Sequence, residues 1–274
     1  MPELPEVETI RRQLNEEISG YTISGLKADA GNNFSHPVGE VRKLITGLKI
    51  EKVDRQAKVL ILSLTGHYHL LFHLKMTGRL LLRAPSDRGD KYVHAVFALT
   101  TGKNRLELRF ADARKFGYVK LLKSDEELLK LRSGYGPEPL KELALNNFRQ
   151  ILSASRRAVK TVLLDQSKIS GIGNIYANDA LWLAGIAPST PSNKITNGRI
   201  NKLFKALLIV LRRGLRYGGA SDNSYVQIHG EAGSYQKHFL VYKRTQEPCI
   251  KCKTPIQRSV LGGRGTFSCP KCQR

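Results

Sequence analysis

The start of the chain, Met1-Pro2-Glu3, combines a potential amine nucleophile with a carboxylate. We expect an aminopeptidase to remove Met1, because the next residue is small, so that the mature chain begins at Pro2. A terminal proline is a secondary amine, and its attack on a sugar C1′ gives an iminium ion, which acts as an electron sink. Part of this amine is neutral at neutral pH, since an α-amino group has a pKa of about 7.7–8.0. Glu3 adjoins it and can transfer protons at the same centre.

The same stretch has the pattern of an ordinary helix start. Pro5 suits the first helical position, and Glu6 and Glu8 suit the positive end of the helix dipole. Apolar residues then recur on one helical face, and a glycine suits the helix end: Val7, Ile10, Leu14 and Gly20. Both interpretations can hold, because a buried helix is a good way to fix a reactive terminus.

The cysteines have the spacing of a metal site, C-x2-C-x16-C-x2-C. Two tight turns can then present four thiolates as a tetrahedron around zinc. A pair of disulfides is the alternative, which a cytoplasmic location disfavours. We therefore predict one structural Zn²⁺, without an open position for water, bound by Cys249, Cys252, Cys269 and Cys272.

Two glycine-rich stretches suit contact with phosphate. Residues 262–265 lie between the cysteine pairs and include Arg264, whose guanidinium can clamp a phosphate, although a solvated loop charge is the alternative. Residues 170–176, Ser-Gly-Ile-Gly-Asn-Ile-Tyr, place two glycines just before a helix, where backbone N–H groups can face a phosphate. An ordinary turn between two helices is the alternative there.

The composition favours a polyanionic partner. The 274 residues include 45 Lys and Arg against 23 Asp and Glu, which gives a net charge of +22. Nucleic acid is the first candidate, although an RNA binder of the ribosomal kind or a binder of acidic membranes would share this charge. The longest solid apolar run, 206–211, is far below the ~20 residues of a membrane span. Since the N-terminus also lacks an apolar signal core, we expect a soluble, cytoplasmic protein.

The pattern along the chain predicts an α+β, multidomain protein. Strands are expected over 59–64, 68–72, 93–99 and 106–110, and short strands joined by tight turns favour an antiparallel sandwich. Helices are expected over 125–131, 159–164 and 200–215. We predict an N-terminal β-sandwich with an N-terminal helix over 1–133, a linker over 134–147, a helical domain over 148–238 and a zinc-ribbon β-hairpin over 239–274.

Residues 2–8, Pro-Glu-Leu-Pro-Glu-Val-Glu, resemble the N-terminus of formamidopyrimidine-DNA glycosylases, bacterial enzymes that remove oxidised purines. The resemblance covers essentially the whole chain and implies that 170–176 belong to a helix–two-turn–helix. It implies a bifunctional glycosylase and abasic-site lyase, in which Pro2 attacks C1′, Glu3 moves protons and Glu6 supports the site. It also gives Lys58, otherwise an ordinary surface lysine, a role in proton transfer, and Arg264 a role at the lesion's phosphate and in the second elimination.

The resemblance also implies a DNA-binding set. Met76, Arg114 and Phe116 match three residues that enter the base stack when a base is flipped out. Core packing is the alternative for Met76 and Phe116. Phosphate or backbone contacts are implied for His73, Lys160 and Asn174.

Several positions depart from the family pattern. Tyr92 stands where many relatives have a DNA-contacting histidine, with His94 two residues on. Ser155 replaces a lysine, and the adjoining Arg156 can substitute for its charge. The loop that closes over the everted purine matches a segment in which Asp222 and Asn223 replace Thr, Lys or Arg, which leaves the lesion preference open; its expected members are Ser221, Asp222, Asn223, Ser224 and Tyr225.

Two other functions remain as alternatives. One is an endonuclease VIII-like glycosylase for oxidised pyrimidines, although that family has glycine where Leu4 stands here. The other is a non-catalytic binder of damaged DNA or of RNA. The expected partner is double-stranded DNA with oxidised bases or abasic sites, bound by a monomer in the bacterial nucleoid and without a membrane.

Overall fold

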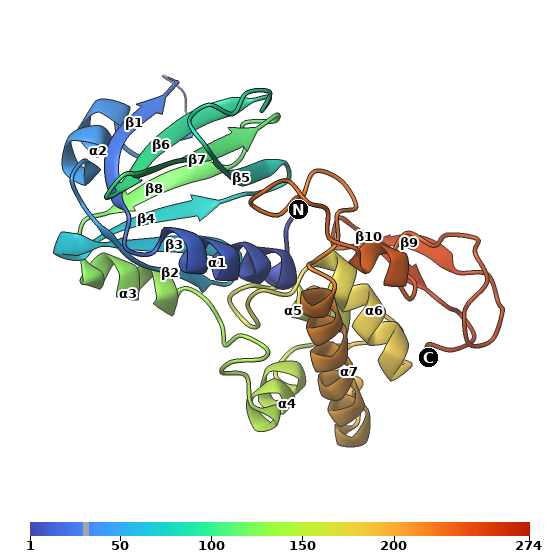
Figure 1. Cartoon of the computed structure of the whole chain (residues 1–274). Helices are drawn as coiled ribbons and strands as arrows, with labels where there is room; N and C mark the ends of the chain where they lie inside the picture. The colour runs from blue at the N-terminus through green and yellow to red at the C-terminus, as the bar shows by residue number, and fades with distance from the viewer. Residues whose placement is uncertain (30–32) are drawn as a thin grey trace. The chain divides into compact units, whose positions relative to one another are not determined.

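Short segments in the first half of the chain form two antiparallel, four-stranded sheets (Figure 1). The computed structural model describes residues 1–29 and 33–274. The first sheet has the order β1-β6-β7-β5, formed by Thr22–Ala28, Val93–Thr101, Asn104–Asp112 and Gly78–Arg83. The second has the order β2-β3-β4-β8, formed by Ile50–Gln56, Val59–Leu64, Tyr68–His73 and Tyr118–Leu122.

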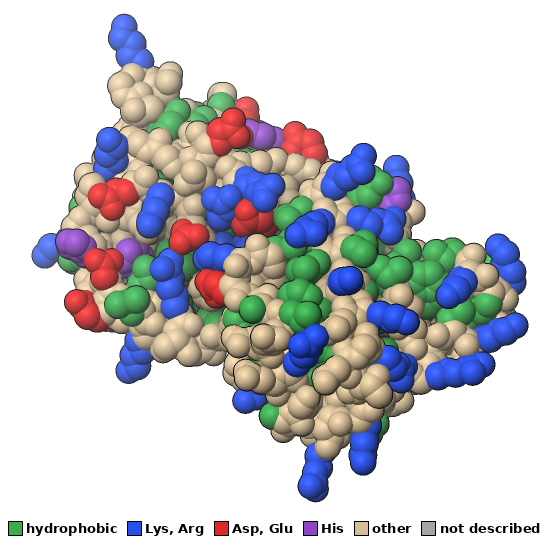
Figure 2. All heavy atoms as spheres, turned by 90° about the horizontal axis from the view of Figure 1, so that it is seen from below, with side chains coloured by type: hydrophobic (Ala, Val, Ile, Leu, Met, Phe, Trp, Pro, Cys, Tyr) green, Lys and Arg blue, Asp and Glu red, His purple; other side chains and the backbone are tan. Residues whose placement is uncertain are grey.

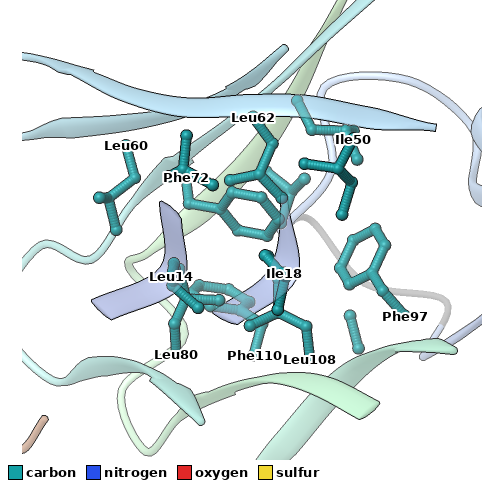
Figure 3. Packing of buried hydrophobic residues seen from close by; sticks show 14 of the residues in the cluster. Leu14, Ile18, Ile50, Leu60, Leu62, Phe72, Leu80, Phe97, Leu108 and Phe110 are labelled. Atoms are coloured by element: carbon teal, nitrogen blue, oxygen red, sulfur yellow. The ribbon is translucent and has the colours of Figure 1, made fainter. Parts of the chain in front are cut away.

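One apolar core joins these sheets to the first helix, α1 (Leu4–Ile18). Figure 3 shows Leu14 and Ile18 of α1 among side chains of both sheets, including Phe72 and Phe110. Each fully buried side chain of this size contributes about 1.5–3 kcal/mol. The core therefore fixes α1, and with it the N-terminal residues. Two further helices, α2 (Val38–Ile45) and α3 (Asp125–Ser133), and the 3-10 turn Thr65–His67 complete this part.

The second half of the chain is mainly helical. Its helices are α4 (Leu145–Ser153), α5 (Val159–Leu163), α6 (Asn174–Ala184) and α7 (Asn197–Arg216), with 3-10 turns at Ser192–Lys194 and Tyr235–His238. A hairpin of β9 (Gln257–Leu261) and β10 (Arg264–Ser268) follows. The buried carboxylate of Asp179 on α6 accepts the N–H groups of Leu240, Val241 and Tyr242 at 3.0–3.2 Å, which fastens the segment before the hairpin to α6.

The chain groups into two units. The N-terminal unit contains 1–133 and 217–234, and the C-terminal unit contains 134–216 and 235–274. Segment 217–234 joins the N-terminal unit through contacts such as Gln13 Nε2 to Gln227 Oε1 (2.6 Å) and Leu82 N–H to the Ile228 carbonyl (2.8 Å). The ranges predicted from the sequence, 1–133, 134–147, 148–238 and 239–274, stay a prediction. They include 217–234 in the helical domain, because no local sequence pattern marks the return of this segment to the sandwich.

The predicted α+β class, with its antiparallel sandwich and terminal hairpin, is confirmed. The four predicted strands correspond to β3, β4, β6 and β7. The other sandwich strands were not predicted; β2, for example, has the largely polar sequence Ile-Glu-Lys-Val-Asp-Arg-Gln. Pro5 takes the second helical position and not the first, because the helix begins at Leu4. Among the described residues, no helix has the length and apolar character of a membrane span.

Candidate active site and nucleic-acid interface

The N-terminus of α1 is held by two glutamates that are almost fully buried. Glu3 caps the helix: its side chain accepts the N–H of Glu6, and its own N–H donates to Glu6 Oε2 at 2.7 Å. The second oxygen of Glu6, Oε1, accepts the N–H of Ala220 at 2.8 Å. The helix-start interpretation is therefore confirmed, and the same cap sets the direction in which the residues before Glu3 leave the helix.

Charged groups from three segments act on the amine at the chain start. Burial lowers the pKa of the Met1 amine below its ordinary value of 8.0; Glu3, Glu6 and Asp222 oppose this, and Lys58 adds to it. The charges of Glu3, Glu6, Lys58 and Asp222 of the lesion loop thus all influence the electrostatic surroundings of the chain start. Such surroundings favour a neutral amine, the nucleophilic form, while keeping carboxylates near it.

Lys58 is only 6% exposed, so the interpretation as an ordinary surface lysine is wrong. It follows Ala57, whose φ of +53° makes the tight turn between β2 and β3. Arg55 holds this turn, because Nη1 donates to the Ala57 carbonyl at 2.9 Å and Nε donates to Glu8 Oε2 at 3.0 Å. The Arg55–Glu8 pair therefore fixes the position of Lys58 relative to α1.

Glu8 is a strong anchor for this arrangement. Burial alone would raise its pKa, but hydrogen bonds from Arg11 and Arg12 and the charge and hydrogen bond of Arg55 outweigh burial and lower the pKa to about 2. The carboxylate is therefore ionised throughout the neutral range. Sequence reasoning missed the pair, because nothing in the local pattern joins Glu8 of the helix to Arg55 of a strand.

The loops β4–β5 and β7–β8 carry the predicted insertion residues. Phe116 is 55% exposed, so core packing is the wrong interpretation for it, and the Arg114 guanidinium lies 4.6 Å from the centre of its ring. Met76 is half-buried. An exposed ring under a guanidinium is a suitable wedge for a base stack, although insertion into DNA by the three residues stays a prediction.

His73, at the end of β4, is set up as a neutral hydrogen-bond donor. Burial, helped by the charges of Lys75 and Lys58, lowers its pKa to about 4. The N–H of Lys75 donates to His73 Nδ1 at 3.0 Å, which leaves the proton of the neutral ring on Nε2. This geometry suits the predicted phosphate contact and makes it insensitive to pH in the neutral range.

Tyr92 and His94 lie in different surroundings. Tyr92 is 62% exposed, and its φ of +62° is uncommon for a residue with a bulky side chain. His94 has both ring nitrogens engaged within the protein, with Nε2 2.8 Å from the Asp112 carbonyl and Nδ1 3.1 Å from Asp29 Oδ2. Of the two predicted DNA contacts, Tyr92 is the accessible one.

The predicted lesion loop, 221–225, is held at its ends and open at its middle. Ser221 Oγ donates to the Tyr225 carbonyl at 2.7 Å and accepts the Gly233 N–H at 2.8 Å. Ser224 Oγ donates to the Met76 carbonyl at 3.0 Å. Tyr225 is buried and Asn223 is exposed, so the middle of the loop is more accessible than its end.

In the C-terminal unit, α5 and α6 grip the hairpin strand β10. Lys160 Nζ donates to the Gly265 carbonyl and to Thr266 Oγ1, both at 2.8 Å, and Asn174 Nδ2 donates to the same carbonyl at 2.9 Å. Lys160 is fully buried, and the bonds given above join it to the hairpin. Its predicted phosphate contact stays a prediction. Arg156, by contrast, is exposed.

The four cysteines come together as predicted. Their Sγ atoms all lie within 4.8 Å of one another, with Cys249–Cys272 at 3.9 Å and Cys252–Cys269 at 3.4 Å. The disulfide alternative is wrong, because a disulfide needs an S–S distance of about 2.05 Å. Zn–S bonds of about 2.3 Å in a tetrahedron separate sulfur atoms by about 3.8 Å, so the donor set fits one structural zinc ion.

The hairpin tip carries Arg264. Gly262 (φ +56°) and Gly263 (φ +71°) form a two-residue turn in which both central residues are left-handed, the arrangement that glycine favours in tight hairpins. Arg264 then pairs with Leu261 at the first position of β10, and its side chain is exposed. The grip of Lys160 and Asn174 on Gly265 fixes the residue next to it.

Positive charge is divided unequally between the units. The C-terminal unit holds 22 of the 45 Lys and Arg but only 5 of the 23 Asp and Glu, and so carries +17 of the net +22. Figure 2 shows Lys and Arg side chains spread over the visible face of the molecule. A surface of this kind suits the phosphates of a nucleic acid.

Three family models match successive parts of the chain. They are the formamidopyrimidine-DNA glycosylase N-terminal domain over residues 1–119, the formamidopyrimidine-DNA glycosylase H2TH domain over 135–225, and a zinc finger found in FPG and IleRS over 246–274. A formamidopyrimidine-DNA glycosylase of Chloroflexus aurantiacus is 42% identical over 275 residues, covering 100% of this chain and 98% of the relative. That of Bacillus subtilis strain 168 is 39% identical over 277 residues, covering 100% and 99%.

The chain belongs to the formamidopyrimidine-DNA glycosylase family. Solved structures agree with this: a complex of the Lactococcus lactis protein with DNA containing an abasic site has a TM-score of 0.91 at 33% identity and covers 99% of each chain. A complex of the same protein with DNA containing Fapy-dG has a TM-score of 0.90 at 33% identity, covering 99% of this chain and 100% of that chain. The zinc finger match and the cysteine geometry together confirm the predicted structural zinc.

Proposed function

We propose that this chain is a DNA glycosylase for oxidised purines and an abasic-site lyase that acts through the amine of Pro2 in base excision repair. Membership of the formamidopyrimidine-DNA glycosylase family supports the glycosylase activity. The observation that supports the assignment of residues is the group of charges at the chain start, where Glu3, Glu6, Lys58 and Asp222 all act on the Met1 amine, one residue before Pro2. The proposal requires that Met1 be removed.

In the proposed reaction, the neutral Pro2 nitrogen forms a bond to C1′ of the damaged nucleotide as the glycosidic bond breaks and the departing base takes up a proton. The sugar ring then opens to an iminium ion, and Glu3 and Lys58 transfer the protons at the sugar. Because the iminium acidifies the C2′ proton, its loss expels the 3′ phosphate in a β-elimination. A second elimination expels the 5′ phosphate, with Arg264 at the phosphate, and leaves a one-nucleotide gap.

The proposed substrate is duplex DNA that contains an oxidised base or an abasic site. The excess cations of the C-terminal unit support contact with phosphates. Met76, Arg114 and Phe116 would fill the place of the flipped base, and the loop 221–225 would close over it. The proposal includes a monomer that acts in the bacterial nucleoid, within the cytoplasm.

The endonuclease VIII-like alternative differs only in the base that is removed. One solved complex of the Lactococcus lactis protein, with a TM-score of 0.90 at 33% identity, contains DNA with an oxidised pyrimidine, so lesion breadth within the family makes this alternative worth testing. Paired duplexes with 8-oxoguanine or thymine glycol separate the two: we expect faster excision of 8-oxoguanine. Faster excision of thymine glycol would reassign the specificity and leave the proposed chemistry in place.

Borohydride trapping tests the proposed chemistry. Reduction of the iminium gives a permanent bond between protein and DNA, so the wild-type chain should form an adduct with an 8-oxoguanine duplex, and peptide mapping should locate it at Pro2. Pro2→Gly, and a chain that retains Met1, should lose this adduct while still binding an abasic-site analogue. A non-catalytic binder gives no adduct. An adduct on a lysine, or full activity with Met1 retained, would contradict the role of Pro2.

A further inference from the structure

The two loops with the predicted insertion residues leave the sandwich at neighbouring positions. Each loop joins a strand of one sheet to a strand of the other, β4 to β5 and β7 to β8. Gly78, where β5 begins, pairs with Asp112, where β7 ends. His73, where β4 ends, pairs with Tyr118, where β8 begins. The register of both sheets therefore brings the loops side by side.

The carboxylate of Asp112 binds both loops. Oδ1 accepts the hydroxyl of Thr77 from the first loop and the N–H of Arg114 (3.1 Å) from the second, and Oδ2 accepts the Gly117 N–H at 2.6 Å. Asp112 is 1% exposed, so little water competes with these donors. A Cβ on Gly117 would lie 3.0 Å from Oδ2 and 2.8 Å from the Phe110 ring, and glycine is therefore needed for this approach.

Both loops also hold a lysine in an unfavourable backbone conformation next to an insertion residue. Lys75 (φ +49°) directly precedes Met76, and Lys115 (φ +56°) directly precedes Phe116. Left-handed φ is uncommon for residues with a Cβ and persists where surrounding contacts fix it. The bonds to Asp112 are contacts of this kind. They hold Thr77, which lies two residues after Lys75, and they hold Arg114 before Lys115 and Gly117 after it.

The lesion loop is attached to the first of these loops. Ser224 Oγ donates to the Met76 carbonyl at 3.0 Å, next to the residue whose hydroxyl Asp112 accepts. At its other end, the Ala220 N–H donates to Glu6, which also accepts the Glu3 N–H. The segment that would close over the everted base is thus fastened between the helix of the proposed nucleophile and the loop of Met76.

We propose that Asp112 is a positioning residue that holds Met76, Arg114 and Phe116 as one insertion unit, and that the Ser224–Met76 bond couples this unit to the lesion loop. The inference rests on the proposed function and adds a dependence between two of its steps. Closure of the lesion loop over the everted base favours insertion of Met76, Arg114 and Phe116 into the space that the base has left. Insertion of these residues in turn favours closure of the loop. An abasic site has no base for the lesion loop to close over. We therefore expect cutting at an abasic site to depend least on the coupling between the lesion loop and the insertion unit.

A double-mutant cycle tests the coupling. Thr77→Val keeps the shape of the side chain and removes only the hydroxyl, and Ser224→Ala removes the bond to Met76. In single-turnover assays, we expect each variant to slow excision of 8-oxoguanine about tenfold and to change cutting at a preformed abasic site by less than about twofold. The double variant should be about as slow as either single one, because both changes break the same link.

Two controls isolate the effect from general damage to the fold. Thr101→Val, at an exposed position of β6, should match the wild type, and Thr77→Ser, which keeps a hydroxyl, should restore excision. Thr77→Val should also weaken the preference for the base opposite the lesion, since Arg114 and Phe116 would engage that base. A merely destabilised fold would not change this preference at a temperature where each variant is folded by circular dichroism.

The inference is overturned by any of three results. Rate losses that multiply, to about 100-fold in the double variant, mean that the two bonds act independently. Equal slowing on both substrates means a general structural role, and wild-type rates for Thr77→Val mean that the Thr77–Asp112 bond does not hold the two loops together as one insertion unit. A wild-type chain that cuts neither substrate would instead contradict the proposed function itself.

Discussion

The two units of the chain use charge in opposite ways. The N-terminal unit nearly balances its charges, with 23 Lys and Arg against 18 Asp and Glu, and buries several of them in fixed pairs such as Glu8–Arg55. The C-terminal unit has few acids, and its cations are mostly on the surface. The N-terminal unit therefore holds charges in fixed pairs, and the C-terminal unit presents an excess of positive charge.

This difference has a physical reason. A reacting amine and its carboxylates need particular pKa values, and a dense group of cations nearby would shift all of them. A phosphate surface needs only many cations, and its affinity depends on salt more than on exact geometry. The unequal charge predicts that Glu3 variants in the N-terminal unit change chemistry more than affinity, and that loss of the zinc hairpin in the C-terminal unit changes affinity. His73 and Arg264 are expected exceptions, because each has a proposed role of the other kind.

Glu3→Gln should cause the greatest loss of activity, and it tests whether the N-terminal unit can lose chemistry while DNA binding is kept. The amide oxygen can still cap α1, but it cannot transfer a proton, so we expect base excision to fall about 10²–10⁴-fold. Binding of an abasic-site analogue, measured by fluorescence anisotropy, should change little. Glu16→Gln, exposed on the same helix, is the control. Equal losses of binding and excision would break the proposed division.

Loss of zinc is the matching test for the C-terminal unit. We expect Cys252→Ala to lower the zinc content and to weaken binding of abasic-site DNA at least about tenfold, because the metal supplies folding free energy for the hairpin that carries Arg264. Cys252→His should retain zinc, since Cys₃His sites are common. Zinc is measured by atomic absorption and binding by anisotropy. Normal binding by a zinc-free Cys252→Ala chain would show that the hairpin does not serve the DNA surface.

A pH experiment sharpens the comparison within the N-terminal unit. Asp222 raises the pKa of the Met1 amine, and we expect it to act in the same direction on the Pro2 amine once Met1 is removed, so Asp222→Thr should lower the pKa of the nucleophile. The neutral, nucleophilic amine then exists at lower pH, and the acidic limb of the kcat/KM profile should move to lower pH. Glu231→Gln, exposed in the same segment, should leave the limb in place. A shift to higher pH would show that Asp222 does not act on the nucleophile.

The smallest expected effect concerns stability and the pair that positions Lys58. The pKa of Glu8 is depressed to about 2, so its ion pairs stabilise the fold above the unfolded value of about 4.5, and this contribution is lost as the pH falls from there towards 2. We expect Glu8→Gln to lower the free energy of unfolding by about 1–3 kcal/mol at pH 7 and by less at pH 3. Urea unfolding at both values measures it, with Glu51→Gln, exposed on β2, as control. A loss of equal size at pH 3 would mean that charge is not its cause.

The sequence allowed prediction of those features that lie close together along the chain. The cysteine spacing predicted the zinc site, and the apolar run over 59–64 and the alternation over 93–99 predicted strands, because each pattern contains its own physical cause. The residues at the chain start were predicted for the same reason. Membership of the family followed from motifs that are local in the same sense.

What could not be predicted depends on contacts between distant segments. Asp112 opens a stretch that the sequence singled out for Arg114 and Phe116, yet nothing in it indicates that its carboxylate also holds Thr77. Nothing in the sequence around Lys160 indicates that this lysine is buried, and only the fold shows that it lies against β10. These are tertiary features, and one sequence does not contain the pairings that create them.

The two-residue turn at the zinc hairpin has a consequence for how this part of the protein can vary in evolution. Side chains in a strand alternate between faces, so one inserted residue after Gly263 that shifted the pairing would turn Arg264 to the opposite face of β10. The two cysteine pairs limit the length from the other side, because one pair precedes β9 and Cys269 directly follows β10. Outside the cysteines, the two turn glycines and Arg264, we therefore expect substitutions in this hairpin to be better tolerated than insertions and deletions.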